Sequence, residues 1–293
     1  MNEHNLKDQQ LPLSIPEQIE NLKELGLVIE DESAAAEFLN DVSYFRFIKA
    51  YSLGLKPRNG QYREGVSFNQ LKELYLFNAK LRQLLFAQLE RIEINLRCRL
   101  SNYFCNTYGV LSYYDSNYFV DPDHHAMFLT DIESEINKNR RAPFIRNFQE
   151  NYRDHKIPFY ALVEIIPFGK LSMFYKNMHS IDKKAIAGSF RVGYTYFESW
   201  IESLAYVRNL CAHYGRLYNA KFTKTPKLYS TDREKGITNN RLFGILNVRT
   251  HAAGIQQNDR TASVAFPALQ AHSAEGLHLF RRTNQDKSNF RIR

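Results

Sequence analysis

The chain has 293 residues, of which 44% are hydrophobic and 14% aromatic, so it is long and apolar enough to fold around a substantial core. Its formal net charge of +8 is compatible with a polyanionic partner, and it contains no run of eighteen apolar residues of the kind that spans a membrane. Three cysteines without a CxxC pair argue against a disulfide framework or a zinc site, and the N-terminus lacks a secretion leader, so we expect a soluble, cytoplasmic protein.

The first 66 residues predict an N-terminal helical extension. Ser14 and Glu17 have capping-box spacing, and Pro16 suits the first turn of an amphipathic helix. A second helix is predicted to start at Ser33, followed by an aromatic-rich segment.

The longest helical period runs from Phe68 to about Tyr108, as one helix or two. Another capping pattern, Ser67 with Gln70, precedes it. With the segments that follow, this stretch predicts a helical core over residues 67–246.

Three acidic residues are candidate partners of Arg208, which lies far along the chain. Glu90 and Glu93 share a helical spacing with Arg97, which indicates either a salt-bridged solvent face or a glutamate that meets Arg208 across two helices. Glu164 lies between apolar neighbours, and a buried acid needs a cationic partner.

Shorter helices are predicted in the middle of the chain. They are expected from Asp123, from Pro158 with a break at Pro167 and Gly169, and from Asp182 to Phe190. The adjacent His124 and His125 point to different faces of a helix, and we interpret them as structural.

The last strongly periodic stretch predicts a helix from about Tyr196 to Leu217, with Thr195 and Glu198 at capping-box spacing. Apolar residues at three- and four-residue steps predict one buried stripe, made of Trp200, Ile201, Leu204, Val207, Cys211, Tyr214 and Tyr218. For the two tyrosines this position favours core packing over stacking on nucleic-acid bases.

This helix also carries polar residues with chemical character. Asn209, His213 and Arg216 are expected to share one face, where Asn209 would hydrogen-bond the ring of His213. Arg208 lies about 140° around the helix from His213. The two side chains would therefore converge only at a helix end or on something outside the helix.

An arginine and a histidine are the residue types that metal-free RNA cleavage needs. A histidine can accept or donate a proton near neutral pH, and an arginine can neutralise the charge that grows on phosphorus. One histidine per chain cannot easily serve as base and acid together, so this chemistry predicts a homodimer. A structural histidine in a chance match is the alternative interpretation.

The basic charge lies after this helix. From Arg216 onward there are fourteen lysines and arginines against five acids, which favours an RNA-binding surface that includes Arg216, Lys221 and Lys224, although a solvated basic tail is equally compatible. Residues 247–293 show no sustained apolar period, so we expect a poorly ordered tail. No metal-ligand spacing or glycine-rich phosphate loop is present, and no cofactor is expected.

Several segments, taken in order over residues 11–246, resemble the Abi-like family of bacterial abortive-infection proteins, the AbiD/AbiF type within the HEPN superfamily. They are LPLSIPEQIENLKELGLVIED, FLNDVSYFRF, GVSFNQLKELYLFNAKLRQLLFAQLERIEINLRCRLSNYF, PFYALVEIIPFGKLSMFYKNM and YVRNLCAHYGRLYN. The sequence after RLFGIL departs from the family, in which a further apolar helix follows.

The resemblance implies an all-α, HEPN-type helical bundle that dimerises through the helices carrying the R-x4-6-H motif. It implies that Arg208 and His213 are the phosphate ligand and the acid/base, with Asn209 as the polar residue after the arginine. It also implies a growth-arresting toxin of phage defence, held off by an RNA or protein antitoxin. Some members of the superfamily bind RNA without cutting it, so a non-catalytic RNA-binding or antitoxin-sensing module is the alternative.

Overall fold

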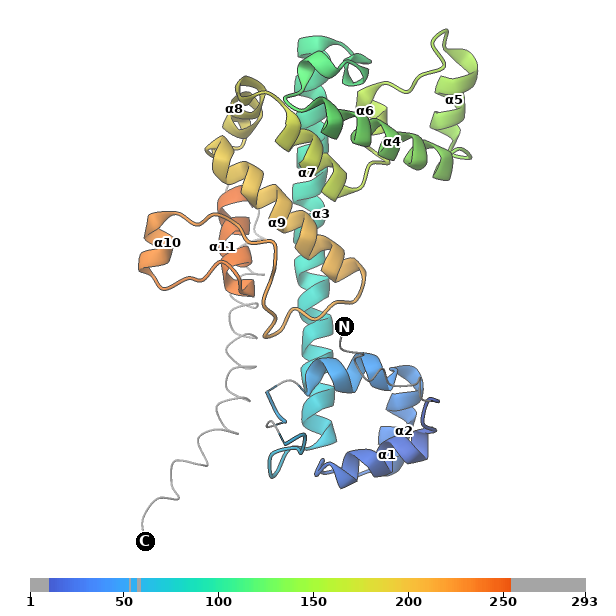
Figure 1. The fold of residues 1–293 in the computed structure, drawn as a ribbon, viewed down its shortest axis with the longest axis vertical. Coiled ribbons are helices and arrows are strands. Elements are labelled where there is room, and N and C mark those ends of the chain that lie inside the picture. The colour runs from blue at the N-terminus through green and yellow to red at the C-terminus, as the bar shows by residue number, and fades with distance from the viewer. Residues whose placement is uncertain (1–10, 53, 57–58, 254–293) are drawn as a thin grey trace, which may run out of the picture. The chain divides into compact units, whose positions relative to one another are not determined.

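The computed structural model describes residues 11–52, 54–56 and 59–253, the last five as backbone alone. Across these ranges the secondary structure is helical, with two isolated β-bridges and no strand, which confirms the all-α prediction (Figure 1). None of the helices in these ranges is long and apolar enough to cross a membrane.

The chain forms two compact units, which divide between Lys80 and Leu81. This division lies inside helix α3 (Phe68–Tyr108). The N-terminal extension expected from the sequence ends at residue 66, just before the same helix begins. Below, unit 1 denotes the described residues up to Lys80 and unit 2 those from Leu81 to 253.

Unit 1 contains α1 (Ile15–Glu24), α2 (Glu32–Asp41), a short π-helix η1 (Phe45–Lys49) and the first turns of α3. The capping box at the start of α1 is confirmed, because the Ser14 side chain accepts from the backbone of Glu17 while the Glu17 carboxylate accepts from the backbone of Ser14. The second helix begins just before the predicted residue, because the carboxylate of Asp31 caps it instead of Ser33.

The core of unit 1 is apolar and aromatic. Leu22, Phe47 and Leu71 are fully buried. The rings of Phe38 and Phe47 meet edge to face with centroids 4.9 Å apart, a favourable arrangement for aromatic pairs. These contacts explain why the aromatic-rich segment of the sequence lies inside this unit.

Helix α3 is a single helix of 41 residues. Its start is fixed as predicted, since the Gln70 backbone N–H donates to the Ser67 hydroxyl at 3.3 Å and the Ser67 N–H donates to the Gln70 side chain at 3.2 Å. Its residues from Leu81 onward belong to unit 2 and carry part of the site described below.

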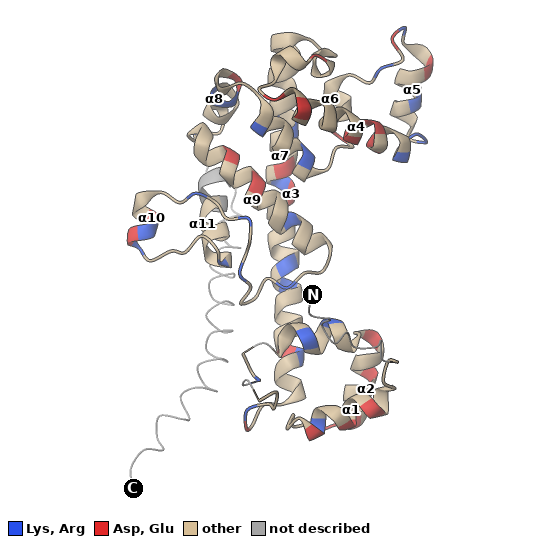
Figure 2. Cartoon of the chain, in the orientation of Figure 1, with Lys and Arg blue, Asp and Glu red and all other residues tan. Residues whose placement is uncertain are grey.

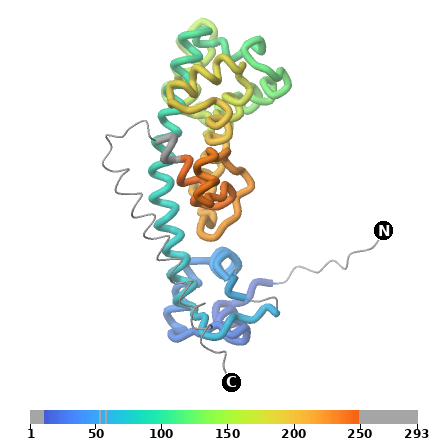
Figure 3. The backbone as a smooth tube through the Cα atoms, turned by 90° about the vertical axis from the view of Figure 1, so that its left-hand side faces the viewer, coloured from blue at the N-terminus to red at the C-terminus, as the bar shows by residue number. Residues whose placement is uncertain are grey.

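After α3, unit 2 consists of shorter helices. In chain order they are η2 (Ser112–Tyr114), η3 (Ser116–Tyr118), α4 (Pro122–Lys138), α5 (Pro143–Asn151), α6 (Phe159–Leu162), α7 (Phe168–Asn177), α8 (Ser180–Ser189), α9 (Tyr194–Ala212), α10 (Ser230–Glu234) and α11 (Leu242–Ala253). Helices α7, α8 and α11 pack against α9, and α4 packs against α7. Figure 3 shows the backbone of this unit from a second direction.

The predicted helix break in the middle of the chain is confirmed at Pro167, which caps α7. The break does not include Gly169, which lies inside α7. Helix α5 is a helix that the sequence patterns did not predict. His125 is structural, as expected, because it is buried, stacks on Phe119 and bonds the carbonyl of Tyr113.

Helix α11 corrects the expected start of the poorly ordered tail. The helix continues past Leu246 to Ala253, and Val248 is buried. The remainder of the region 247–293 lies outside the described residues. Residues 247–253 therefore form a helix without a sustained apolar period, as the end of α11, which packs on α9.

Candidate functional site

Helix α9 presents the predicted apolar stripe to the core of unit 2. Trp200, Leu204 and Val207 are buried along it, and the indole N–H of Trp200 donates to the carbonyl of Lys227 at 2.7 Å. The predicted capping box is wrong, because the helix begins after Gly193 and the carboxylate of Glu198 instead accepts from Lys183 at 2.9 Å.

The end of α9 differs from the prediction in a way that matters for the motif. The helix stops at Ala212 instead of Leu217, and His213 is its C-cap. Tyr214 has a φ of +59°, its N–H donates to the carbonyl of Cys211 at 3.2 Å, and the N–H of Gly215 donates to that of Leu210 at 2.7 Å. These two bonds and the left-handed residue between them define a Schellman motif.

The Schellman motif separates residues that were expected to share one helical face. Asn209 is still on the helix, His213 is at its cap and Arg216 lies beyond it, outside the helix. Asn209 contacts His213 through its backbone carbonyl, which accepts the His213 N–H at 3.0 Å. No hydrogen bond of the described residues joins its side chain to the imidazole. The side chain of His213 is exposed at the helix end.

Two features hold this turn in place. A Cβ atom at Gly215 would lie 3.0 Å from both the carbonyl oxygen and a methyl group of Leu210, so only glycine fits without displacement. Arg82, buried on α3, donates to the carbonyl of Gly215 at 3.4 Å, a long hydrogen bond. Neither residue was singled out by the sequence patterns.

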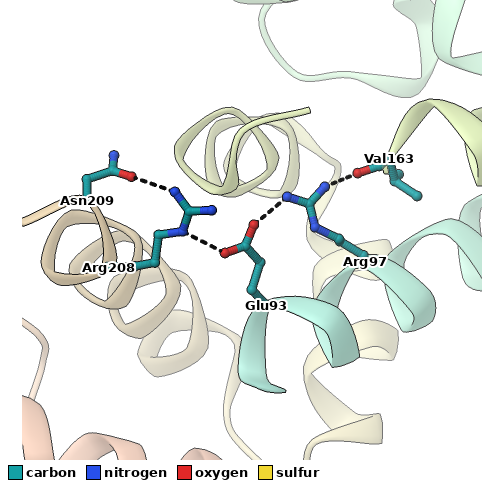
Figure 4. A network of polar contacts seen from close by, with 5 residues as sticks. All are labelled: Glu93, Arg97, Val163, Arg208 and Asn209. Atoms are coloured by element: carbon teal, nitrogen blue, oxygen red, sulfur yellow. Dashed lines mark hydrogen bonds and ion pairs between the residues drawn. The ribbon is translucent and has the colours of Figure 1, made fainter. Parts of the chain in front are cut away.

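Arg208 is anchored by a buried acid on the neighbouring helix (Figure 4). Its Nε donates to Oε2 of Glu93 at 3.0 Å, while the other carboxylate oxygen, Oε1, accepts from Arg97. Arg97 also donates to the carbonyl of Val163. The Glu93 side chain is only 7% exposed, so these charges are paired as burial requires.

This anchoring leaves part of the Arg208 guanidinium available. Its Nη1 donates to Oδ1 of Asn209 at 3.5 Å, and its Cζ atom lies 5.6 Å from the ring centre of Phe86. No partner of the Nη2 amino group is found in the part of the chain that the structure describes, and the side chain is 31% exposed. An arginine held at Nε in this way can still offer N–H groups to an anion.

The three candidate acids have different positions. The prediction that a glutamate meets Arg208 across two helices is confirmed for Glu93. The solvent-face interpretation is wrong for Glu93 and Arg97, whose ion pair is largely buried, although Glu90 is exposed. Glu164 is also exposed, so its apolar sequence neighbours did not indicate burial.

The two tyrosines near the motif do not continue the apolar stripe. Tyr214 is 66% exposed, which makes the core-packing prediction wrong for this residue, whereas Tyr218 is half-buried and burial raises its pKa. Cys211 does belong to the stripe, and burial raises the pKa of its thiol to about 12. It therefore stays protonated at neutral pH and cannot act as a nucleophile.

The three candidate RNA-binding cations lie after α9 in a segment without regular structure. Arg216 is half-buried and Lys221 exposed. Lys224 lies 2.6 Å from Oε1 of Glu202 on α9, and this carboxylate raises the pKa of Lys224. Figure 2 shows acidic segments along α9.

A cavity of about 450 Å³ lies elsewhere in unit 2, between α4, α7 and α9. Lys224 and Glu202 line it, but Arg208 and His213 do not. The described residues contain no cluster of three or more side chains suited to a metal ion. The candidate site is therefore the surface at the C-terminal end of α9.

Together these features define an all-α protein in which a histidine caps a helix and an arginine five residues earlier is held by a buried carboxylate. The sequence profile described as Abi-like protein matches residues 37–219, more than half of the chain, so the chain belongs to the Abi-like family. Membership indicates a role in abortive infection, a form of phage defence. Comparison with curated proteins and with solved structures gives no significant match.

Proposed function

We propose that this protein is a metal-independent endoribonuclease toxin of an abortive-infection system, which cuts RNA through His213 and Arg208. The observation that carries the proposal is the arrangement at the end of α9, where Glu93 holds Arg208 through Nε and His213 is exposed at the cap. Such a pair offers one group that transfers protons and one that binds phosphate, as RNA cleavage requires.

The reaction is an internal transfer at phosphorus. The 2′-oxygen loses its proton and attacks the adjacent phosphate, so the bond from O2′ to phosphorus forms while the bond to O5′ breaks. The leaving 5′-oxygen takes up a proton. The products are a 2′,3′-cyclic phosphate and a 5′-hydroxyl, and no water is consumed. His213 serves as the base or as the acid of this step.

Arg208 binds the scissile phosphate through the N–H groups that Glu93 does not use. Charge grows on the phosphate oxygens during attack, and a fixed cation stabilises it without having to reorganise. The ion pair with Glu93 on one side and Asn209 on the other supplies that fixed position. In this role Asn209 orients Arg208 and does not contact the histidine ring. Glu93 positions Arg208 through the ion pair at Nε.

The second proton transfer requires another group. A second copy of the chain would provide one if its α9 end faced the first, because each protomer carries one exposed His213 at that end. We therefore propose a homodimer through this surface. Static light scattering of the purified protein measures the mass directly, and a monomer that still cuts RNA would remove this part of the proposal.

RNA reaches the site along the basic segment after α9. Lys221 is exposed and is the cation best placed to meet phosphates, with Arg216 close to the motif in the chain. Lys224 contributes less while it is paired with Glu202. In a cell, an RNA or protein antitoxin would act by covering this surface.

The test uses the full chain and its His213→Ala variant, incubated with total RNA and with a structured RNA in excess EDTA. We expect cutting by the wild type, with cyclic-phosphate ends, and a loss of at least 100-fold in the variant, in line with removal of a general acid or base. His124→Ala is the matched control, because His124 is exposed in the same unit and lies 3.2 Å from Asp121, apart from the motif.

Each outcome assigns a function. Cleavage that survives in His213→Ala, or that disappears in EDTA in the wild type, contradicts the mechanism. If neither protein cuts but both bind RNA with a strong salt dependence, the protein is a non-catalytic RNA-binding or antitoxin-sensing module.

A further inference from the structure

Tyr214 occupies a backbone conformation that tyrosine rarely adopts. Its φ of +59° places it in the left-handed region at the C′ position of the Schellman motif, where glycine is the usual residue. A residue with a Cβ atom is strained there, and a bulky one is an outlier. Strain of this kind persists at functional sites, where the side chain serves a purpose other than stability.

The turn has no other position for an exposed ring. His213 precedes Tyr214 and holds the imidazole, while Gly215 follows it and cannot carry a side chain without meeting Leu210 at 3.0 Å. An aromatic ring directly beside the exposed histidine must therefore stand at 214. Tyr214 as a whole is 66% exposed, although its side chain is large and mostly apolar.

We propose that the ring of Tyr214 stacks on a nucleotide base next to the scissile phosphate, so that the substrate is RNA whose bases are unpaired at the cut. This inference rests on the proposed function and names its substrate class. Inside an A-form duplex both faces of a base are covered by its neighbours, whereas an unpaired base can leave the stack and lie on an aromatic side chain.

The neighbouring chemistry agrees with this assignment. Arg208 binds the phosphate and His213 handles the protons, but neither contacts a base in the proposed mechanism. A stacked base would fix the register of the strand, so that one phosphate lies at Arg208 while its ribose hydroxyl lies at His213. Stacking requires only a π-face, which makes the preference one for unpaired RNA more than for a particular sequence.

Three substitutions of Tyr214 distinguish the effect of the aromatic ring from the effect of the backbone strain. Tyr214→Phe keeps the ring, Tyr214→Leu keeps bulk and strain but removes aromaticity, and Tyr214→Gly removes the ring and the strain together. The probe is a fluorescein-labelled, single-stranded 2′-O-methyl oligoribonucleotide, which cannot be cut because it lacks a free 2′-hydroxyl. Its dissociation constant is measured by anisotropy at one fixed salt concentration, and the same strand in a duplex is the comparison.

We expect Tyr214→Phe to bind the single strand as the wild type does, and both Tyr214→Leu and Tyr214→Gly to bind it about tenfold more weakly, as loss of one stacking contact predicts. Duplex binding should change little in all three. The urea concentration at the midpoint of unfolding should depend on the backbone strain and not on the ring. We expect it to rise in Tyr214→Gly and to stay near the wild-type value in Tyr214→Leu.

The inference is overturned if Tyr214→Leu binds the single strand like the wild type, or if the wild type does not bind it. It is also overturned if affinity across the variants correlates with the urea midpoint of unfolding and not with the presence of the ring. Its failure is distinct from that of the proposed function, which is decided by cleavage of the matching unmodified RNA. If the wild type cuts RNA while all Tyr214 variants bind the single strand equally well, only the stacking proposal is contradicted.

Discussion

Unit 1 and unit 2 differ in what they bury. Among the described residues, the buried polar side chains of unit 1 are neutral, and they include Ser52, Tyr62 and Asn78. Unit 2 buries ionisable groups throughout, namely Arg82, Glu93, His125, Asp182 and Asp232. Both units have well-packed aromatic cores, so the difference does not arise from a lack of apolar residues.

Burying an ionisable group is costly unless its partners are also built into the fold. Two of these groups in unit 2 have such partners: Glu93 pairs with two arginines, and Oδ1 of Asp182 accepts from the hydroxyls of Tyr103 and Tyr108 at 2.8 and 2.7 Å. Replacing buried ion pairs by apolar side chains of similar volume is often neutral or stabilising. The charges in unit 2 therefore indicate a purpose other than stability, and one of these networks ends at Arg208.

Among the buried charges of unit 2, Glu93 has the largest expected effect on stability. Glu93→Gln leaves Arg97 and Arg208 without their counter-charge in a largely buried position, and breaking a buried ion pair costs about 3 kcal/mol or more. We expect this loss in the free energy of unfolding from urea titrations followed by Trp200 fluorescence. Trp200 is the sole tryptophan and is buried in unit 2, so the signal reports this unit.

Glu90→Gln is the matched control, because Glu90 lies on the same helix three residues earlier and is exposed. Its replacement should change the unfolding free energy by less than about 0.5 kcal/mol. If both variants behave alike, the buried charge of unit 2 does not contribute as the comparison requires.

Local sequence signals determined much of the fold, because they act within a few residues. The reciprocal bonds at Ser14 and at Ser67 followed from spacing alone. The end of α9 could not be found in this way. Its stop is a Schellman motif in which tyrosine, instead of glycine, takes the left-handed position, and Tyr214 and Tyr218 happen to extend the apolar period.

The site was predictable in its residues but not in its connections. The motif named Arg208 and His213, and spacing along α3 named Glu93. Which acid meets Arg208 depends on how α3 packs on α9, a long-range contact that no local pattern encodes. The same holds for Arg82, which reaches Gly215 from 133 positions earlier in the chain.

A second, smaller effect of buried ionisable groups on the stability of unit 2 is expected at alkaline pH. Burial and the carboxylate of Asp182 raise the pKa of both Tyr103 and Tyr108 to about 12, above the ordinary value of 10. The folded state therefore holds these protons more tightly than the unfolded state. Their contribution to stability is complete below about pH 10 and is lost as the pH rises towards 12.

Asp182→Asn removes the carboxylate from this pair of tyrosines. We expect it to bring both pKa values closer to 10 and to make the alkaline decline of unit 2 shallower than in the wild type, in urea titrations between pH 9 and about 12. Burial raises the pKa of Tyr113 and Tyr175 still further, and their contribution to the alkaline decline is the same in both proteins. Equal slopes in the two proteins would show that Asp182 is not coupled to the tyrosines.

The smallest effect concerns RNA binding by two exposed lysines of unit 2. Lys224 is paired with Glu202, whereas Lys221 has no ion pair among the described residues. If both met phosphates equally, each change to glutamine would lower the salt dependence of single-stranded RNA binding by about 0.7 in the slope of log K against log salt. We expect that change for Lys221→Gln and a smaller one for Lys224→Gln, because Glu202 at 2.6 Å already neutralises Lys224. Glu202→Gln should release Lys224 and steepen the slope. A slope that is unchanged by Lys221→Gln would remove this lysine from the RNA path and direct the search to Arg216.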